Sequence, residues 1–488
     1  MDASADSDNS QRKFIRVNAT GYLFQTYDDN GHAWLEYSTN GGSAWNLANY
    51  GEPLDYNFIN GTSPGSKDPS LSYYDRNGYD VVAAAIEEPN SSGHYSIYLD
   101  VFYYSNGSYL PFGPQWIDDQ PDSTYSVDAN PNVVLNGPDN NSQLEFIVTF
   151  EKSTVNGQAG IGCKAGVLLA NYSYEVSQLT PAQLVDGTDS YSQDATVYAN
   201  YSATNPGIYC DIAWEEYYSS SSIQIEGSGI DFSESGGSWV YNGEAPTLIS
   251  NNSCPVNYAP SIIQMPDGSA QICWIMDLSG GQHQAFSTQV VYWNSDYPTT
   301  FNEFGTDPYY VSLNLSNDAT DPQRFVWSDY GGNGNDDWWG YMTDGQTVVN
   351  QNNNGGFGPH VQINNAQSSG DMLTSIYRPF NTPYYFKTYM NQLGKTSRSA
   401  LFTTYSSQPD DGYRLYGTEG NARYANGVRR TGAEGRDSCK RRAERGKAPG
   451  TVQRLTPGKR SILLPSRRRN PCHHEEDALA EVTEPLQP

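Results

Sequence analysis

The stretch "EYSTNGGSAWN", residues 36–46, joins two strand-like runs and carries the chemistry of a turn. The side chain of Asn40 can accept hydrogen bonds from the backbone N–H groups that follow it, and Ser38 belongs to the same pattern. Gly42 stands where the chain needs a positive φ, and Trp45 packs the returning strand. The stretch therefore predicts a hairpin between two antiparallel strands.

A repeated strand start is the strongest signal in the rest of the chain. Segments such as "KDPSLSYY" and "YAPSIIQ" each lead into a turn and then into an apolar run, and neighbouring starts lie 48–65 residues apart. A first unit, "FIRVNATGYLFQTYDD" (residues 14–29), precedes them and makes seven units. The starts centre on Pro69, Pro131, Thr196, Pro260, Pro308 and, in the last unit, "GDMLTSI" near Asp371.

Four strands per unit at this period predict an all-β fold, a β-propeller of four-stranded blades. We expect seven blades, with six as the alternative count. A string of about four β-sandwich domains is the rival architecture.

Turns like the one at residues 36–46 recur late in several units, which places them between the third and fourth strands. The full pattern resembles the Asp-box of the sialidase-like (BNR-repeat) propellers, and the resemblance covers residues 14–420. In that family the box is a structural turn remote from the catalytic centre, so the resemblance implies fold more than activity. The box positions are Ser38, Asn40, Gly42 and Trp45 in the first turn and Asp296 and Phe301 in a second, with shortened copies near Asn106, Ser235 and Asp344.

We expect three parts in the chain, an extension at 1–13, the propeller at 14–420 and a tail at 421–488, and charge separates the tail from the rest. Residues 1–420 carry 13 Lys and Arg against 47 Asp and Glu, whereas the tail carries 15 against 8. The basic, aromatic-poor tail is predicted to be disordered. The acidic body argues against nucleic acid as its partner, and no apolar run is long enough to cross a membrane.

Carboxylates recur where the second strand of a unit is expected to end. One interpretation is that each acid solvates a strand end or caps a turn. The other is a ring of carboxylates that binds a ligand on the face opposite the box turns, assisted by Trp338 and Trp339 in a neighbouring loop. The acids are Asp28, Glu87, Glu151, Glu215, Asp277 and Asp329, and the seventh unit, at "YYFKTYMN", has none.

The family resemblance also implies an alternative, a glycoside hydrolase. A sialidase-like site uses three arginines to clamp a carboxylate, a tyrosine–glutamate pair as nucleophile and an aspartic acid/base. The candidates in chain order are Arg16, Asp28, Glu215, Arg324, Arg378 and Tyr389.

The cysteines favour packing over metal chemistry. Cys210 and Cys273 occupy equivalent places in adjacent units, which indicates two buried small apolar residues, while a bridge between Cys254 and Cys273 stays open. We predict no metal site and no cofactor, with Ca²⁺ considered only for the oxygen-rich loop at 328–339.

The preferred function is a secreted or cell-surface, monomeric, non-catalytic propeller that binds a glycan or another extracellular ligand. A glycoside hydrolase on the same face is the first alternative. The second is a structural or adhesive module whose partner is a protein.

Overall fold

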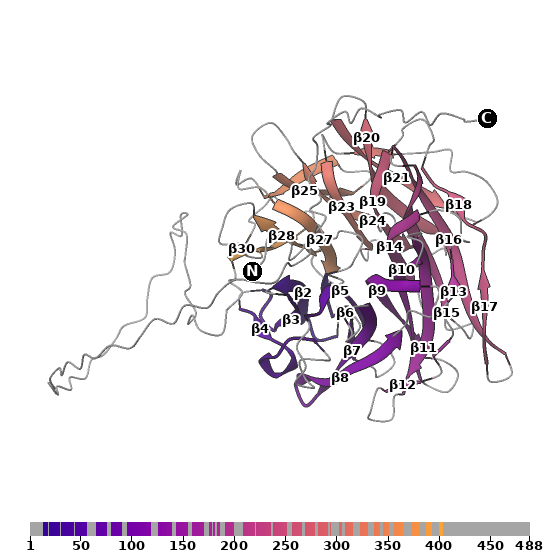
Figure 1. Ribbon diagram of the computed structural model, residues 1–488. Coiled ribbons are helices and arrows are strands. Elements are labelled where there is room, and N and C mark those ends of the chain that lie inside the picture. The colour runs from indigo at the N-terminus through magenta and orange to yellow at the C-terminus, as the bar shows by residue number, and fades with distance from the viewer. Residues whose placement is uncertain are drawn as a thin grey trace, which may run out of the picture. The chain divides into compact units, whose positions relative to one another are not determined.

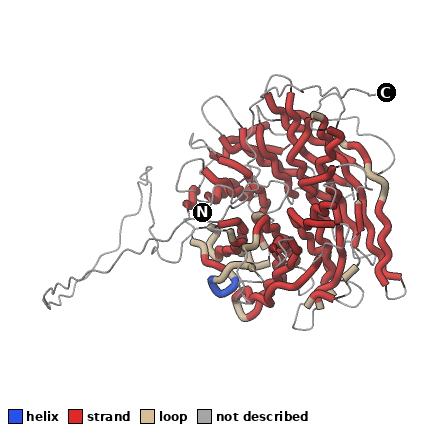
Figure 2. Tube along the Cα trace, in the orientation of Figure 1, coloured by secondary structure: helices blue, strands red, loops and turns tan. Residues whose placement is uncertain are grey.

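The computed structural model describes residues 13–403 apart from several loops, and describes side chains only as far as Trp293. The chain divides into two units, Met1–Gly417 and Thr418–Pro488, and every described strand lies in the first. The tail predicted to be disordered lies outside the described residues. The described part is almost entirely strand (Figure 2), with one turn of 3-10 helix, η1 (Asn49–Gly51). No helix in it is long and apolar enough to cross a membrane.

The first two sheets are antiparallel and four-stranded, with strands paired in chain order (Figure 1). The first contains β1 (Phe14–Arg16), β2 (Leu23–Asp29), β3 (His32–Ser38) and β4 (Asn46–Leu47). The second contains β5 (Lys67–Tyr74), β6 (Val81–Pro89), β7 (Tyr95–Ser105) and β8 (Ser108–Asp118).

The middle of the chain repeats this order with short additional strands. The third sheet contains β9 (Tyr125–Pro138), β10 (Leu144–Thr154), β11 (Ala159–Leu168), β12 (Val176–Ser177) and β13 (Gln183–Leu184). The next group contains β14 (Tyr191–Ala199), β15 (Ile208–Ser219), β16 (Ser222–Ser235), β17 (Ser238–Gly243) and β18 (Thr247–Leu248). A single parallel pair, Ile223 with Val256, joins it into one nine-stranded sheet with β19 (Val256–Gln264), β20 (Ala270–Leu278), β21 (Gln282–Val290) and β22 (Asn302–Phe304).

Two four-stranded antiparallel sheets complete the described part. One contains β23 (Pro308–Leu315), β24 (Gln323–Asp329), β25 (Asp336–Tyr341) and β26 (Gly345–Asn350). The other contains β27 (Gly356–Asn364), β28 (Met372–Pro379), β29 (Lys387–Gln392) and β30 (Ala400–Thr403).

The first strands of these groups contact one another in cyclic order. β5 contacts β9, and the series continues through β14, β19, β23 and β27, while β1 contacts both β27 and β5. This closed order with antiparallel four-stranded groups is the topology of a β-propeller, which confirms the predicted fold class. The count of seven blades stays a prediction, because the side chains that would pack the last groups lie outside the described residues.

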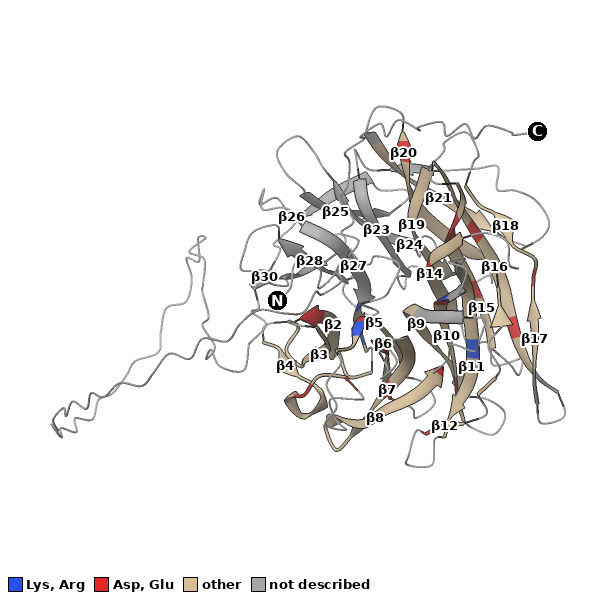
Figure 3. Ribbon diagram, in the orientation of Figure 1, with Lys and Arg blue, Asp and Glu red and all other residues tan. Residues whose placement is uncertain are grey.

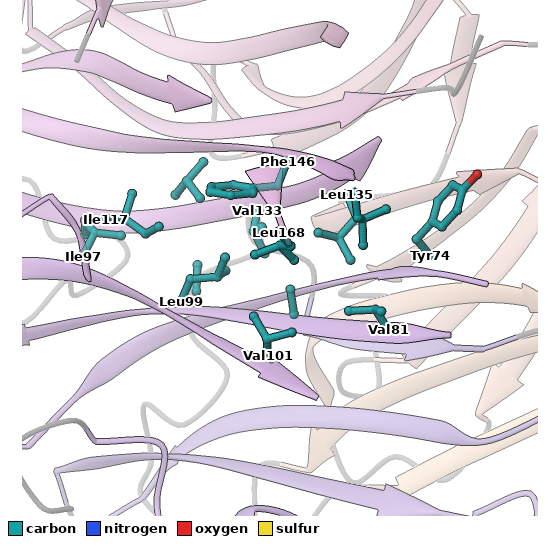
Figure 4. Close-up of a cluster of buried hydrophobic side chains, with 14 of the residues drawn as sticks. Tyr74, Val81, Ile97, Leu99, Val101, Ile117, Val133, Leu135, Phe146 and Leu168 are labelled. Carbon is teal, nitrogen blue, oxygen red and sulfur yellow. The ribbon is translucent and has the colours of Figure 1, made fainter. Parts of the chain in front are cut away.

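The core lies between neighbouring sheets, and β6 shows how the sequence provides for it. Its run "VVAAAIEEP" is buried up to the last residue because both of its faces are covered. Val81 lies in one buried cluster with Val133 and Phe146 of the third sheet (Figure 4), and Ala83 belongs to the same cluster. Ile86 packs toward the first sheet. Alternating side chains thus fill two different interfaces.

The structure corrects the seventh repeat. The segment near Asp371 was predicted to begin the unit, but Met372–Pro379 is β28, the second strand of its sheet. The first strand is β27, and its register shift includes Pro359, as the shift in β5 includes Pro69. The segment "YYFKTYMN" accordingly falls at the third strand, β29, and not at the second.

Candidate functional site

The six recurring acids share one topological position. Each lies near the end of the second strand of its group, just before the hairpin to the third strand; Glu87 pairs with Ile97 and Glu215 with Ile225, for example. The strands are β2, β6, β10, β15, β20 and β24. We call this end of the sheets the acidic face. The opposite end, where the third strand turns into the fourth, is the turn face.

Four of the acids connect one group of strands to the next. Each carboxylate accepts a hydrogen bond from a backbone N–H in or beside the first strand of the following group, 40–44 residues later in the chain. We call these bonds latches. The pairs are Asp28 Oδ2 with Asp68 N (3.1 Å), Glu87 Oε2 with Asn130 N (2.9 Å), Glu151 Oε1 with Asp194 N (2.8 Å) and Glu215 Oε1 with Ala259 N (2.8 Å).

The backbone geometry of the donors explains why the pattern recurs. At each donor the first strand carries a register shift against the second strand of its own group. A bulge leaves the extra residue outside the ladder, so its N–H is available to another acceptor. The donors Asp68, Asn130, Asp194 and Ala259 all have positive φ, from 47° to 54°. Three of the four stand directly before proline, which is the repeated strand start seen in the sequence.

Further partners differ from one carboxylate to the next. Glu151 Oε1 also accepts a hydrogen bond from Asn130 Nδ2 (2.8 Å), so Asn130 joins two latches. Glu215 Oε2 accepts one from the hydroxyl of Tyr217 (3.0 Å), and Glu87 Oε1 forms an ion pair with Lys67 Nζ (2.5 Å). Protein groups therefore already satisfy much of this ring.

Burial separates the acids into two kinds. Glu87 and Glu215 are buried, whereas Asp28, Glu151 and Asp277 are partly exposed. The side chain of Asp329 lies outside the described residues, although Asp329 ends β24 as predicted. The carboxylate of Asp28 has its Oδ1 atom buried and its Oδ2 atom in a latch, so Glu151 and Asp277 are the described acids that offer carboxylate surface to a ligand.

Electrostatics raise the pKa values of the first two acids. Burial raises the pKa of Asp28 well above its ordinary value, and the negative charge of Asp68 raises it further. The charge of Lys13 and the latch hydrogen bond from Asp68 N act in the opposite direction. Burial likewise raises the pKa of Glu87, Asp68 again adds to the shift, and the ion pair with Lys67 opposes it. Both shifts thus have burial as their largest cause, and Glu87 keeps its ion pair with Lys67.

Strand register separates Arg16 from the predicted acid Asp28. Arg16 pairs with Leu23 at the start of β2, and Asp28 lies five residues further along β2, about 17 Å away at the usual rise of a strand. Arg16 lies at the turn face and Asp28 at the acidic face. The sialidase-like grouping of these two residues is not assembled.

The remaining enzyme candidates also divide between the two ends. Arg324 is the second residue of β24, toward the turn face, whereas Arg378 pairs with Phe357 near the end of β28. Arg378 in the last sheet thus corresponds in register to Glu87 in the second sheet, where Glu87 pairs with Lys67. Tyr389 pairs with Ser375 inside the last sheet. The three arginines of the predicted clamp do not share one face.

The two tryptophans proposed to contact a ligand lie in a strand. Trp338 and Trp339 belong to β25, where the sequence suggested a loop. Strand pairing explains the difference, because Trp338 pairs with Trp327 and Trp339 with Val326 of β24. Their side chains lie outside the described residues, and so does half of the loop considered for Ca²⁺.

The turn at residues 36–46 forms as predicted. Ser38 Oγ donates to Asn40 Oδ1 (2.9 Å) and accepts the N–H of Gly42 (2.9 Å), while Asn40 Oδ1 accepts the N–H of Ala44 (2.9 Å). Gly42 has φ +85°, and Trp45 is buried. Its identity as an Asp-box stays a prediction. The second predicted box, at Asp296 and Phe301, lies outside the described residues.

The described cysteines are buried away from any metal chemistry. Cys163, Cys210 and Cys273 are buried free thiols, as predicted for Cys210 and Cys273. Cys254 lies outside the described residues. Among the residues that the structure describes, no group of His, Cys, Asp and Glu is arranged to hold a metal ion.

No family model and no curated protein sequence matches this chain. Among solved structures, the lectin BP39L from Burkholderia pseudomallei aligns with 79% of this chain and 97% of its own, at 11% identity and a TM-score of 0.47. The lectin of Aleuria aurantia aligns with 84% of this chain and 100% of its own, at 11% identity and a TM-score of 0.38. The Hadza microbial sialidase Hz136 aligns with 65% of this chain and 62% of its own, at 13% identity and a TM-score of 0.37. The chain therefore spans less than two thirds of that sialidase. The fold assignment therefore rests on the sheet topology.

Proposed function

We propose that this protein is a binding module that holds a neutral, hydroxyl-rich ligand, a glycan, on the acidic face. The observation that carries the proposal is that Glu151 and Asp277 are partly exposed at the same strand position in different groups. Carboxylate oxygens are good acceptors for sugar hydroxyls. The buried members, Glu87 and Glu215, each accept a hydrogen bond from the following group of strands.

Charge favours a neutral or cationic ligand over an anionic one. The chain carries a net charge of -27, and Figure 3 shows acidic segments along many described strands. Such a field repels anions from the rim. Placement outside the cell, where glycans are common, is part of the proposal.

Separation of the candidate catalytic residues supports binding without catalysis. Arg16 and Asp28, which the sialidase-like alternative groups together, lie about 17 Å apart along β2. The carboxylates of Asp28, Glu87, Glu151 and Glu215 are each engaged in a latch. A glycoside hydrolase and a protein-binding module remain the alternative functions.

A glycan array with the full chain and a matched set of variants tests the proposal. The double variant Glu151→Gln with Asp277→Asn removes two charges while keeping side-chain oxygens. We expect it to bind any neutral glycan at least tenfold more weakly than the parent. Asp231→Asn is the control, because Asp231 pairs with Tyr209 toward the turn face of its sheet.

Three outcomes contradict the proposal. One is no binding of any glycan by the parent, and another is equal binding by the parent and the double variant. Release of chromophore from aryl glycosides by the parent, lost in the double variant, would establish the hydrolase instead.

A further inference from the structure

Four tyrosines gather at the turn face, where the first sheet meets the second. Tyr22 directly precedes β2 and Tyr37 lies near the end of β3, whereas Tyr104 and Tyr109 pair across the β7–β8 hairpin. Between ring centroids, Tyr22 lies 6.1 Å from Tyr37, 6.0 Å from Tyr104 and 5.5 Å from Tyr109. We call these four residues the tyrosine cluster.

The ring planes of the tyrosine cluster face in more than one direction. The planes of Tyr22 and Tyr37 are 6° apart, while the plane of Tyr104 stands at 85° to Tyr22 and at 54° to Tyr109. A flat stack of rings offers one aromatic face to a ligand. Steeply inclined rings suit a rounded group, which is the arrangement found in aromatic cages for ammonium ligands.

The tyrosine cluster is anchored on one side and open on the other. Tyr22, Tyr37 and Tyr109 pack against the buried core between the first two sheets and stay partly exposed, and Tyr104 is 37% exposed. The hydroxyl of Tyr22 donates to the carbonyl oxygen of Gly107 (3.0 Å), which joins the first sheet to the β7–β8 turn. Rings that are already held in place lose little freedom when a ligand binds.

The charges beside the tyrosine cluster are negative. The hydroxyl of Tyr109 donates to Asp80, and Asp75 Oδ2 accepts the N–H of Ala19 (2.9 Å). Burial raises the pKa of Tyr109, and Asp80 and Asp75 raise it further. Among the residues that the structure describes, neither Asp75 nor Asp80 forms an ion pair with a cationic side chain. This surface therefore attracts cations.

We propose that the tyrosine cluster, with Asp75 and Asp80, binds a small organic cation, a quaternary ammonium ion of the choline type. The ring faces attract the positive charge, and the methyl groups on its nitrogen cover them. A neutral sugar fits this surface less well, because the hydroxyls of Tyr22 and Tyr109 already donate to protein acceptors. The site uses none of the residues of the acidic face, so it stands or falls separately from the glycan site there.

Equilibrium dialysis of the full chain against radiolabelled choline tests the proposal. Physiological ionic strength screens attraction by the net charge of the chain alone. The competing probes are dimethylbutanol, which is the uncharged carbon isostere of choline, and D-glucose. We expect choline to bind about tenfold more tightly than dimethylbutanol, since the ring faces favour the charge. D-glucose should not displace choline.

Tyr104 is the position to vary, because it is the most exposed ring of the cluster. Tyr104→Leu should weaken choline binding about tenfold, whereas Tyr104→Phe keeps the aromatic face and should bind choline within about twofold of the parent. Tyr50→Leu is the matched control and should bind choline as the parent does, because Tyr50 is an 80% exposed tyrosine outside the cluster. Melting temperatures measured for all three variants report whether each is folded.

Asp80→Asn separates the charge from the packing. It keeps an oxygen acceptor for the hydroxyl of Tyr109 and removes one negative charge. Choline binding should weaken about threefold, while binding of dimethylbutanol should not change. Together with the comparison of choline and dimethylbutanol in the parent, this variant decides the proposal even if Tyr104→Leu does not fold.

Each contrary result overturns the proposal. Absence of choline binding, or equal affinity for choline and dimethylbutanol, shows that the chain does not recognise the charge. Unchanged binding by a folded Tyr104→Leu, or equal losses in Tyr104→Leu and Tyr50→Leu, shows that choline binds elsewhere. Displacement of choline by D-glucose would assign the cluster to a sugar, and a loss in Tyr104→Phe as large as in Tyr104→Leu would assign recognition to the hydroxyl.

Discussion

The latch at Glu151 gives the sharpest test of how the groups of strands are held together. Glu151 Oε1 accepts two hydrogen bonds of 2.8 Å, from Asp194 N in the next group and from Asn130 Nδ2 in its own. Hydrogen bonds to a charged group contribute about 1.5–3 kcal/mol each. Because Glu151 is partly exposed, water can take over part of each hydrogen bond when the carboxylate is removed. The lower value, about 1.5 kcal/mol, therefore applies to each of the two hydrogen bonds.

Glu151→Ala should therefore lower the free energy of unfolding by about 3 kcal/mol. Glu151→Gln keeps an oxygen acceptor and loses only the charge, so its cost should be about 1 kcal/mol. Urea unfolding at pH 7, followed by tryptophan fluorescence, measures both changes. Trp214 is a suitable reporter because it is fully buried in the neighbouring group.

The control for this test is Asp231→Ala. Asp231 is partly exposed, and its contact with Asn242 Nδ2 is long, at 3.5 Å. Its loss should change the unfolding free energy by less than about 0.5 kcal/mol. The reasoning is refuted if Glu151→Ala is no more destabilising than this control, or if Glu151→Ala and Glu151→Gln cost the same.

Three further predictions follow from local geometry. Asn40→Ala should lower the unfolding free energy by about 1 kcal/mol through loss of the turn acceptor, and an unchanged urea midpoint would contradict this. Ala259→Gly should raise it by about 0.5–1 kcal/mol, because glycine adopts positive φ without strain; a lower midpoint would contradict the assigned backbone. Burial raises the pKa of Glu36 from 4.5 to about 7, so the stabilisation by its neutral form is complete below pH 4.5 and is lost as the pH rises through 7. As the pH rises from 4.5 to 8, the free energy of unfolding of Glu36→Gln should therefore increase by about 3 kcal/mol relative to that of the parent. A constant difference between the two free energies over that range would refute the raised pKa.

The sequence by itself determined the repeat, the fold class and the position of the acids within each unit. These features depend on short-range patterns, since alternating apolar residues, turn residues and a fixed repeat length are all visible in one strand or hairpin. The turn at Ser38 and Asn40 was predictable for the same reason, because all its hydrogen bonds span four residues or fewer. The start of the last unit was predicted at the wrong strand, because a local apolar pattern does not show whether the run near Asp371 is the first or the second strand of its sheet.

Only the tertiary structure decided what the acids do. The two ends of each latch lie 40–44 residues apart, and a donor such as Ala259 has no side-chain signal of its own. Its N–H becomes available because a bulge in one sheet faces the strand end of another, which no local pattern records. Strand register likewise placed Arg16 at the end of its sheet opposite Asp28, although the two are only twelve residues apart in the chain. Pairing between strands, and packing between sheets, fixes which side chains meet, because both depend on the positions of chain segments that the sequence separates.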